Sequence, residues 1–471
     1  MVFSSLIFLY VFLPLCLLAV WLTTDNRVQN AILLAASLFF YAWGEPIYVI
    51  LMVATAFVIW LCGLMVGRSR DKARKRIFLG LAVVIALSSL VYFKYTGFLV
   101  QIINLLPFVN LKVPEISLPI GISFYTFQAL TYIIDLYRGE IKTQRSFARF
   151  LLYVSLFPQL IAGPIVRYSD VELQLSKREI TLDGMASGIG RFLTGLAKKV
   201  LIANYASEIV EVSLESGHFA QISSATALLG IIAFAIQIYF DFSGYSDMAI
   251  GLGHMFGFHF LENFKHPYIA STITEFWRRW HISLSTFFRD YVYIPLGGNR
   301  HHRLRNTFLV WFLTGLWHGA SWNFVLWGLY YFALLMFERA FILPYQKKIP
   351  KFLGHILTMT AVLFGWSLFY FTDWSRLMTF LGRIFAPGLA GFLDIEAKIL
   401  WRQHIVFILA ALIFATPILP WLKKRLRRPL HQLDHSLAGG IIQTVGVLAL
   451  LLISTASLVA SSYNPFLYFR F

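Results

Sequence analysis

The chain has 471 residues, of which 58% are hydrophobic and only 13% are Asp, Glu, Lys or Arg, yet its formal charge at pH 7 is +17. In soluble domains about 25% of all residues are charged. The composition of this chain therefore excludes a soluble enzyme and indicates an integral membrane protein. The two cysteines, Cys16 and Cys62, lie in separate apolar stretches, and we predict neither a disulfide framework nor a metal site.

Apolar stretches of about 20 residues, the length that crosses a bilayer, recur along the whole chain. The first has no Lys or Arg before Arg27 and no small-residue cleavage site, so we expect a retained span rather than a signal peptide. The candidate spans are residues 6–22, 28–41, 48–66, 78–99, 150–166, 228–250, 308–341, 356–371, 405–422 and 440–460. With shorter or broken segments added, we expect about ten to twelve membrane helices in one integral membrane domain, residues 1–471.

Positive charge is concentrated in two short loops, residues 68–76 and 423–428. Short basic loops mark the cytoplasmic side of a membrane protein, and anionic headgroups attract them. Three candidate spans precede the first loop and one follows the second, so we expect both termini on the opposite, external side. Some of these basic residues can also bind a polyphosphate ligand.

Helix-breaking residues interrupt several apolar stretches, among them Pro46, Pro119, Pro158 and Pro164. Broken backbone at membrane depth is tolerated only where protein or a wet cavity satisfies its polar groups. The predicted fold class is therefore an all-α polytopic membrane protein, with tilted and re-entrant helices lining a cavity. Residues 104–117 are predicted to form a loop, and residues 255–305 short interfacial helices and a loop.

Two stripes of polar residues fall within apolar sequence at helical spacing. The first comprises Gln128, Tyr132 and Asp135, and the second comprises Gln237, Asp241 and Tyr245, continuing into Ser246 and Asp247. Residues three or four apart share one helix face. Such stripes either line a polar cavity or join helices through hydrogen bonds, and the sequence leaves both interpretations open.

A third polar group lies between residues 275 and 305. Arg278 and Arg279 alternate with Trp residues, a pattern typical of a membrane interface, and His281 leads back into apolar sequence. A Gly-Gly turn and its neighbours can also cradle phosphates with backbone N–H groups and charge. The turn consists of Gly297, Gly298, Asn299 and Arg300.

His318 stands alone in an aromatic, almost uncharged stretch, flanked by Trp317 and followed by Asn323. Ionisable groups at bilayer depth are expensive, so each is a candidate functional residue. A neutral imidazole can act as a general base, removing a proton from a hydroxyl that attacks a thioester. The alternative is a histidine that holds two helices together by hydrogen bonds. The residues themselves favour this structural role for His281.

Several motifs together resemble the membrane-bound O-acyltransferase family, in its bacterial branch that serves alginate O-acetylation. They extend over nearly the whole chain. The matching segments are LPIGISFYTFQ at 118–128, FPQLIAGPI at 157–165, YFDFSGYSDMAIG at 239–251, ENFKHPY at 262–268, TEFWRRWHISLS at 274–285, DYVYIPLGGNR at 290–300 and GLWHGASWNF at 315–324.

This resemblance implies a ring of tilted helices around a central pore or funnel, with His318 as catalytic base and His281 assisting it. The acyl donor implied is acetyl-CoA from the cytoplasm, whose phosphates suit Arg278, Arg279 and the glycine turn. Acetyl then crosses the bacterial inner membrane to periplasmic acetyltransferase-like partners, with both termini periplasmic. The C-terminal aromatic segment, residues 466–471, resembles a motif in which a tyrosine, here Tyr468, relays the acyl group. An aromatic interfacial anchor is the alternative for Tyr468.

Other functions remain compatible with the residues. Within the family, another acyl group can come from a carrier protein instead of acetyl-CoA. A transporter or flippase would use the same intramembrane polar residues, although no pseudo-symmetric halves are visible. A scaffold subunit would recruit periplasmic enzymes. The acceptor, whether alginate, cellulose or peptidoglycan, is not encoded in any motif, and membrane lipids but no nucleic acid are expected as partners.

Overall fold

The computed structural model describes residues 1–161, 163–217, 219–386, 391–425, 437–460 and 466–467. All regular elements within these residues are helical, with no strand among them, which confirms the all-α prediction. The helices form two compact units, and each packs mainly within itself. Unit 1 comprises residues 1–192, 245–262 and 286–295, and unit 2 comprises residues 193–244, 263–285 and 296–471.

Seven helical segments in the described part of the chain are long and apolar enough to cross a membrane, so the protein is a multi-pass membrane protein. These segments are Tyr48–Arg68, Lys72–Ile103, Ser224–Met255, Trp322–Tyr345, Lys351–Tyr370, Ile395–Phe414 and Ala438–Ala460, and Phe8–Trp21 is a shorter apolar helix. The higher helix count and the single domain expected from the sequence stay predictions.

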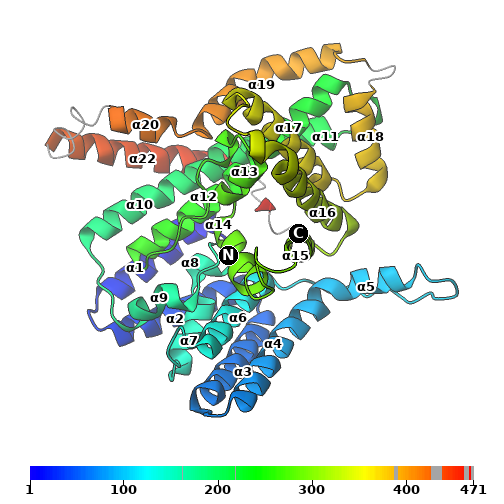
Figure 1. Ribbon diagram of the computed structural model, residues 1–471. Coiled ribbons are helices and arrows are strands. Elements are labelled where there is room, and N and C mark those ends of the chain that lie inside the picture. Colours follow the sequence, from blue (N-terminus) through cyan, green and yellow to red (C-terminus); the bar gives the residue numbers. More distant parts are fainter. Residues whose placement is uncertain (162, 218, 387–390, 426–436, 461–465, 468–471) are drawn as a thin grey trace. The chain divides into compact units, whose positions relative to one another are not determined.

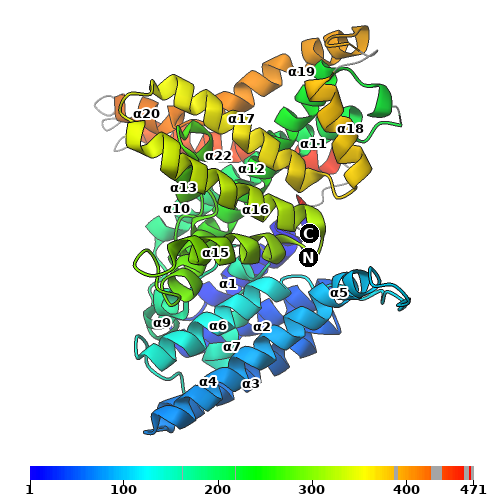
Figure 2. The ribbon, with the colours of Figure 1, turned by 45° about the vertical axis from the view of Figure 1, so that its right-hand side comes forward.

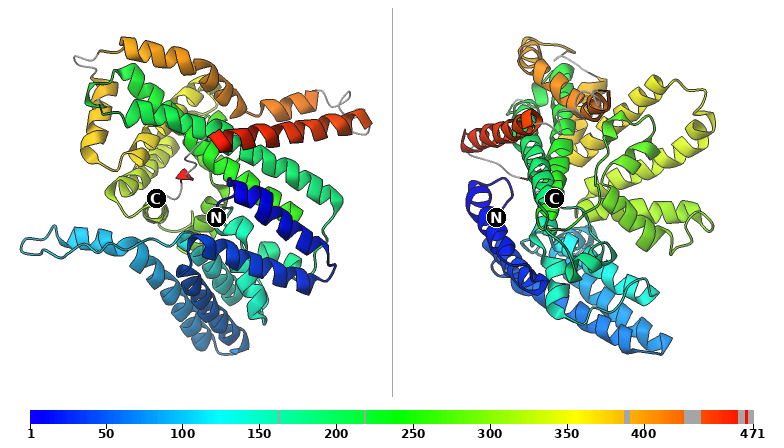
Figure 3. Two further views of the ribbon diagram at one scale, coloured as in Figure 1. Left: turned by 180° about the vertical axis from the view of Figure 1, so that it is seen from behind. Right: turned by 90° about the vertical axis from the view of Figure 1, so that its left-hand side faces the viewer.

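Unit 1 is built mainly from the N-terminal helices. They are α1 (Leu13–Trp21), α2 (Asn26–Gly44), α3 (Tyr48–Arg68), α4 (Lys72–Leu90), α5 (Thr96–Ile103), α6 (Ile122–Arg138), α7 (Phe147–Ser155), α8 (Phe157–Leu160) and α9 (Tyr168–Ser176). Helices α3 and α4 lie side by side and both pack on α6 (Figures 1 and 3). The segment between α5 and α6 contains no helix, which confirms the loop predicted at residues 104–117.

Unit 2 contains the remaining helices. They are α11 (Asn204–Leu214), α13 (Ile273–Arg279), α15 (Arg303–His318), α16 (Trp322–Phe337), α17 (Lys351–Tyr370), α18 (Trp374–Phe385), α19 (Ile395–Phe414), α20 (Ile418–Arg425) and α22 (Leu437–Ala460). Three more helices contribute residues to both units: α10 (Leu182–Ala197), α12 (Ser224–Met255) and α14 (Ile282–Phe288). The short helices α13 and α14 confirm the prediction that residues 255–305 hold no continuous span.

Three predicted spans differ from the observed helices. Residues 308–341 form two helices, because the chain turns between His318 and Trp322. Residues 150–166 break at Leu156, whose ψ of 110° is not helical, and a new helix begins at Phe157. Pro158 is tolerated in the first turn of that helix but would clash with the carbonyl four residues earlier if α7 continued through it. The span predicted at 405–422 instead begins at Ile395 and ends at Phe414, ahead of Pro417.

Helices α15 and α16 form a tightly packed hairpin in unit 2 (Figure 2). Their closest approach is at two glycines, because a Cβ at Gly315 would collide with the carbonyl oxygen of Phe324, and one at Gly328 with that of Trp311. Small residues allow such close helix approach in membrane proteins. The hairpin brings Trp327 of α16 back beside His318 at the end of α15.

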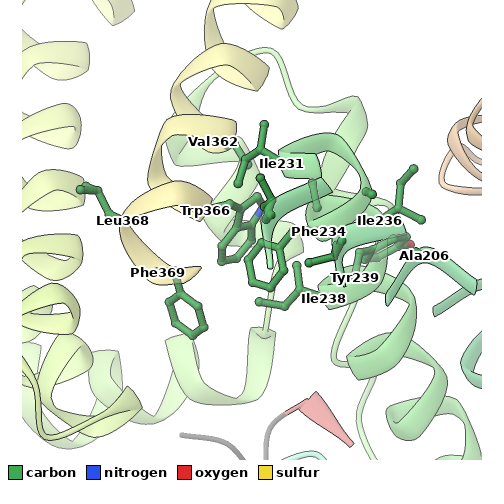
Figure 4. Packing of buried hydrophobic residues seen from close by; sticks show 14 of the residues in the cluster. Ala206, Ile231, Phe234, Ile236, Ile238, Tyr239, Val362, Trp366, Leu368 and Phe369 are labelled. Atoms are coloured by element: carbon green, nitrogen blue, oxygen red, sulfur yellow. The ribbon is translucent and has the colours of Figure 1, made fainter. Parts of the chain in front are cut away.

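The core of unit 2 is unusually rich in aromatic residues. Figure 4 shows Trp366 of α17 packed among Ile231, Phe234 and Ile238 of α12. Trp366 and Trp327 are almost completely buried. Large rings of this kind contribute most of the contact area between packed helices. The core therefore fixes α12, α16 and α17 as one framework around the histidine at the end of α15.

Candidate active site

His318 is the last residue of α15 and is buried. The chain leaves the helix through Gly319 in an extended conformation, where a Cβ would collide with the Phe324 ring. Only glycine permits a turn this tight against that ring. His318 therefore stands at the helix end, immediately before this turn.

Aromatic rings surround the His318 imidazole on several sides. Its ring centroid lies 4.9 Å from Trp317, 4.9 Å from Trp327 and 5.2 Å from Phe369, each in an edge-to-face arrangement. Asn323 supports this enclosure, because its side-chain N–H donates to the backbone carbonyl of Phe369 at 3.3 Å. Asn323 also accepts a hydrogen bond from Ser321 at 2.5 Å. Packing therefore restricts the orientation of the His318 ring.

His281 lies between α13 and α14 in a left-handed backbone conformation, with φ of +44°. Its Nδ1 is 3.2 Å from Oδ1 of Asn263. The same oxygen accepts the backbone N–H of Ser283 at 3.1 Å, which identifies it as the carbonyl end of the amide. Nδ1 of His281 therefore carries the proton and donates it to Asn263, and Nε2 holds the lone pair.

His281 is a neutral imidazole in this setting. Burial lowers the pKa of its side chain to about 3, because desolvation penalises the charged form. Its Nε2 has no hydrogen-bond partner among the described residues. A neutral ring with a vacant acceptor nitrogen can receive a hydrogen bond from a substrate hydroxyl or from water.

Trp317 links the two histidines. Its ring centroid lies 5.7 Å from His281 and 4.9 Å from His318. All three residues belong to unit 2, so the structure brings together the pair singled out in the sequence. Asn263, which orients His281, was missed by sequence reasoning. A buried Asn eighteen residues upstream carries no local signal for that contact.

A small cavity opens beside His318. It measures about 20 Å³, which is room for about one water molecule. Its lining comes from α12, α16, α17, the end of α13, the end of α15 and the C-terminal segment: Ile238, Asp241, Phe242, Trp280, His318, Trp327, Trp366, Phe369, Phe466 and Leu467. The cavity is therefore much smaller than an acyl thioester.

Asp241 provides the charged part of that lining. Its carboxylate is buried and lies 2.8 Å from Nζ of Lys199, which is also buried. The other carboxylate oxygen accepts the backbone N–H of Leu467 at 2.7 Å. Asp241 was predicted as a pore-lining residue, whereas Lys199 was overlooked. A lysine inside the apolar run that follows Leu196 was the available signal.

The residues predicted to bind donor phosphates have divided roles. Arg279 forms an ion pair with Glu275 at 2.8 Å, whereas Arg278 is exposed and has no ion-pair or hydrogen-bond partner among the described residues. Burial alone would raise the pKa of Glu275, but hydrogen bonds from Ser271 and Arg279 lower it below its usual value. Arg278 is thus the guanidinium of this pair that is available to a ligand.

The glycine turn is held from inside by Asn306, which sequence reasoning did not identify. Its side-chain N–H groups donate to the carbonyls of Leu296, Gly298 and His301, at 3.1, 3.1 and 2.7 Å. Gly297 and Gly298 both have positive φ, so glycine is required for the turn. The N–H of Arg300 bonds back to Gly297. A phosphate site at Gly297, Gly298, Asn299 and Arg300 stays a prediction.

The stripe on α6 belongs to unit 1, whereas the two histidines belong to unit 2. Tyr132 accepts the backbone N–H of Gln144 at 3.1 Å, and Asp135 accepts the Tyr291 hydroxyl at 2.8 Å. These bonds match the interpretation of the stripe as links between segments. Gln128 differs, because its buried amide has no hydrogen-bond partner in the described part of the chain.

The stripe on α12 is divided between the units. Gln237 and Asp241 belong to unit 2, whereas Tyr245, Ser246 and Asp247 belong to unit 1. Asp247 accepts hydrogen bonds from Arg191 at 2.9 and 2.6 Å. Lining of a common pore by both stripes stays a prediction. Tyr468, the predicted acyl relay, lies outside the described residues, as do residues 426–428 of the basic loop.

Comparison with known proteins places the chain among membrane acyltransferases. The profile of the membrane-bound O-acyltransferase family matches residues 122–381. A probable alginate O-acetylase of Azotobacter vinelandii is 40% identical over the full length of both chains. A peptidoglycan O-acetyltransferase of Helicobacter pylori is 32% identical over 100% of this chain and 98% of its own. A teichoic acid D-alanyltransferase of Bacillus subtilis is 30% identical over 53% of this chain and 68% of its own. The chain is therefore an O-acyltransferase and a member of the membrane-bound O-acyltransferase family.

Proposed function

We propose that the protein transfers acetyl from acetyl-CoA on the cytoplasmic side of the bacterial inner membrane to an acceptor on the periplasmic side. The final acceptor is a hydroxyl of an exopolysaccharide of the alginate type. Full-length similarity to a probable alginate O-acetylase supports acetyl as the group and a polysaccharide as the acceptor. The two basic loops support a periplasmic position for both termini.

His318 acts as the general base in this proposal. It removes the proton of the acceptor hydroxyl, and the oxygen attacks the thioester carbonyl carbon. The new C–O bond replaces the C–S bond, and coenzyme A leaves as a thiol after taking a proton from the imidazolium. The enclosing rings of Trp317, Trp327 and Phe369 favour the neutral form of the base, because a desolvated imidazolium is unfavourable.

His281 assists by orienting the reacting hydroxyl or a water molecule, and it neither gains nor loses a proton. Its Nδ1 proton is committed to Asn263, so Nε2 is the atom that can accept a hydrogen bond from the acceptor hydroxyl or from a water molecule. Orientation of a reacting group in this way contributes without any change of protonation. The shared contact with Trp317 supports joint action of the two histidines.

The donor and the partners follow from charge and chemistry. Arg278 and Arg300 are exposed cations, the second within the glycine turn, and both are suited to the phosphates of coenzyme A. Periplasmic acetyltransferase-like proteins would receive the acetyl group and place it on the polymer. The phenol of Tyr468 is a candidate for an intermediate acceptor, and an aromatic interfacial anchor is the alternative role.

One observation carries the proposal: the buried imidazole of His318 lines a cavity and shares Trp317 with a second, oriented histidine. The test is a His318→Gln variant, since Gln fills a similar volume but has no basic nitrogen. Labelled acetyl-CoA is supplied to the cytoplasmic face of inverted membrane vesicles that contain the partner proteins. Labelled polymer is then measured.

We expect His318→Gln to lower acetyl transfer by roughly 10²- to 10⁴-fold, with normal protein levels. His404→Ala is the matched control and should transfer normally, because His404 contacts Tyr205 and is not part of the lining of the His318 cavity. Normal transfer by His318→Gln would refute the catalytic role. Label appearing only from an acyl carrier protein would refute acetyl-CoA as the donor.

A further inference from the structure

The described C-terminal residues Phe466 and Leu467 are buried, although they lie within six residues of the chain end. Both line the cavity beside His318. The Phe466 ring lies 6.5 Å from the ring of Phe242, another residue of the lining. A terminal segment is seldom ordered unless something holds it. What holds this segment is therefore a question about the site itself.

The anchor of this segment is a buried carboxylate. Asp241 accepts the backbone N–H of Leu467 at 2.7 Å, and its second oxygen pairs with Lys199 at 2.8 Å. The side chains of Asp241 and Lys199 are 2% and 5% exposed. Burying such a pair costs desolvation energy that the attraction barely offsets, and apolar replacements are often no less stable. A contribution to the stability of the fold therefore does not explain why this ion pair is present.

Local backbone geometry allows Lys199 to reach Asp241. Gly244, one turn after Asp241, packs against the chain at the end of α10. A Cβ there would lie 2.7 Å from the carbonyl oxygen of Gly195 and 3.1 Å from the backbone nitrogen of Lys199. The helix α22, which leads toward the C-terminal segment, packs on the same turn of residues Lys198–Ala203. The Gly244 contact and the packing of α22 therefore both lie next to Lys199, which pairs with the carboxylate that binds Leu467.

We propose that Asp241 and Lys199 are positioning residues that fix the backbone of Leu467 at the His318 cavity. Lys199 orients the carboxylate, the carboxylate binds the Leu467 N–H, and Phe466 and Leu467 are thereby held in the cavity wall. This inference rests on the proposed function of His318, and it assigns the ion pair to docking of the chain's own C-terminus.

The test measures docking directly, by the accessibility of a cysteine at position 467. Cys16 and Cys62 are first replaced by Ala, and Leu467→Cys is labelled with a water-soluble maleimide in intact membranes. Two double variants are compared. Lys199→Met with Asp241→Asn removes both charges but keeps an acceptor oxygen. Lys199→Met with Asp241→Leu removes the acceptor as well, at similar volume.

We expect labelling of position 467 to stay close to the native rate in the variant with Asn. In the variant with Leu it should rise roughly tenfold to a hundredfold, because a hydrogen bond to a buried acceptor is lost. Acetyl transfer should fall in parallel with the rise in labelling. Ala411→Cys, a buried position of the same core, should stay unlabelled in every variant and shows that unit 2 remains folded.

Equal labelling in the two double variants would overturn the docking role. Faster labelling without loss of acetyl transfer would overturn the positioning role. His318→Gln separates this inference from the proposed function, since it should abolish transfer while labelling at position 467 stays slow. If His318→Gln keeps full transfer, the proposed function fails, whereas the labelling series still decides whether Asp241 holds the C-terminal segment.

Discussion

The glycine contact between α15 and α16 offers a sharp test of how the site is positioned. In Gly315→Ala the added methyl would collide with the carbonyl oxygen of Phe324, and it would lie 3.2 Å from that carbonyl carbon and 3.4 Å from the α-carbon of Gly328. All of these are backbone atoms, so no flexible side chain can yield. The two helices have to separate by a few tenths of an ångström or more.

Two opposing effects of Gly315→Ala nearly cancel in the free energy of unfolding, whereas the transfer rate should still fall. Overpacking a close contact costs about 1–3 kcal/mol, whereas Ala gains about 1 kcal/mol over Gly in a helix. We therefore expect a loss of roughly 0–2 kcal/mol in unfolding free energy. His318 lies three residues after Gly315 and Trp327 one residue before Gly328, so the same shift alters their 4.9 Å ring contact. Misplacement of about 1 Å can lower a rate by about 10²-fold.

The assay compares the acetyl-transfer rate and the thermal unfolding of the purified protein in detergent. Gly315→Ala should lose most of its transfer rate with only a small shift in unfolding temperature. Gly446→Ala in α22 is the matched control, because a Cβ there meets nothing within 4 Å. It should leave the transfer rate unchanged and raise the unfolding temperature slightly, because Ala gains about 1 kcal/mol over Gly in a helix. Native transfer and native unfolding in Gly315→Ala would refute the argument that this crossing positions the base.

Two further predictions concern the segment that carries His281. Glu338 accepts the backbone N–H groups of Ile273 and Thr274, each at 2.8 Å. Glu338→Ala leaves these donors without an acceptor and should lower the unfolding free energy by about 3 kcal/mol, whereas Glu338→Gln keeps one acceptor oxygen and should lower it by about 1 kcal/mol. Thermal unfolding checks this, and equal losses in the two variants would contradict it. The pKa of His281 is about 3 in the folded protein, below its ordinary value of about 6.5. Between these two pH values the unfolded chain takes up a proton at this residue and the folded chain does not, so the stability that His281 contributes is complete above pH about 6.5 and is lost as the pH falls toward 3. His281→Gln should therefore show a weaker fall in unfolding temperature between pH 6.5 and 4.5 than the native protein, and parallel curves would count against a buried neutral imidazole.

Much of the fold could be predicted because hydropathy is a local property. The long apolar stretches at residues 48–66, 228–250 and 440–460 became the helices α3, α12 and α22. Motifs around His281 and His318 also led to the correct family. The errors were local as well: the turn after His318 contains no proline, so a continuous apolar stretch from 308 to 341 gave no sign of two helices.

The site itself depended on contacts between residues distant in sequence. The pairing of Lys199 with Asp241, the orientation of His281 by Asn263 and the docking of Leu467 on Asp241 each join segments that no local pattern connects. The stripe on α12 shows the same limit, because helical spacing predicts that Asp241 and Tyr245 share one face but does not predict that Asp241 meets Lys199 and Leu467.

The sequence by itself thus determined that the chain is helical, crosses the membrane and belongs to an acyltransferase family, because hydrophobic length and short motifs are local. Only the tertiary structure decided which polar groups meet. Partners for a buried charge or a histidine nitrogen are set by how helices pack, and packing depends on side-chain volumes summed over the whole core.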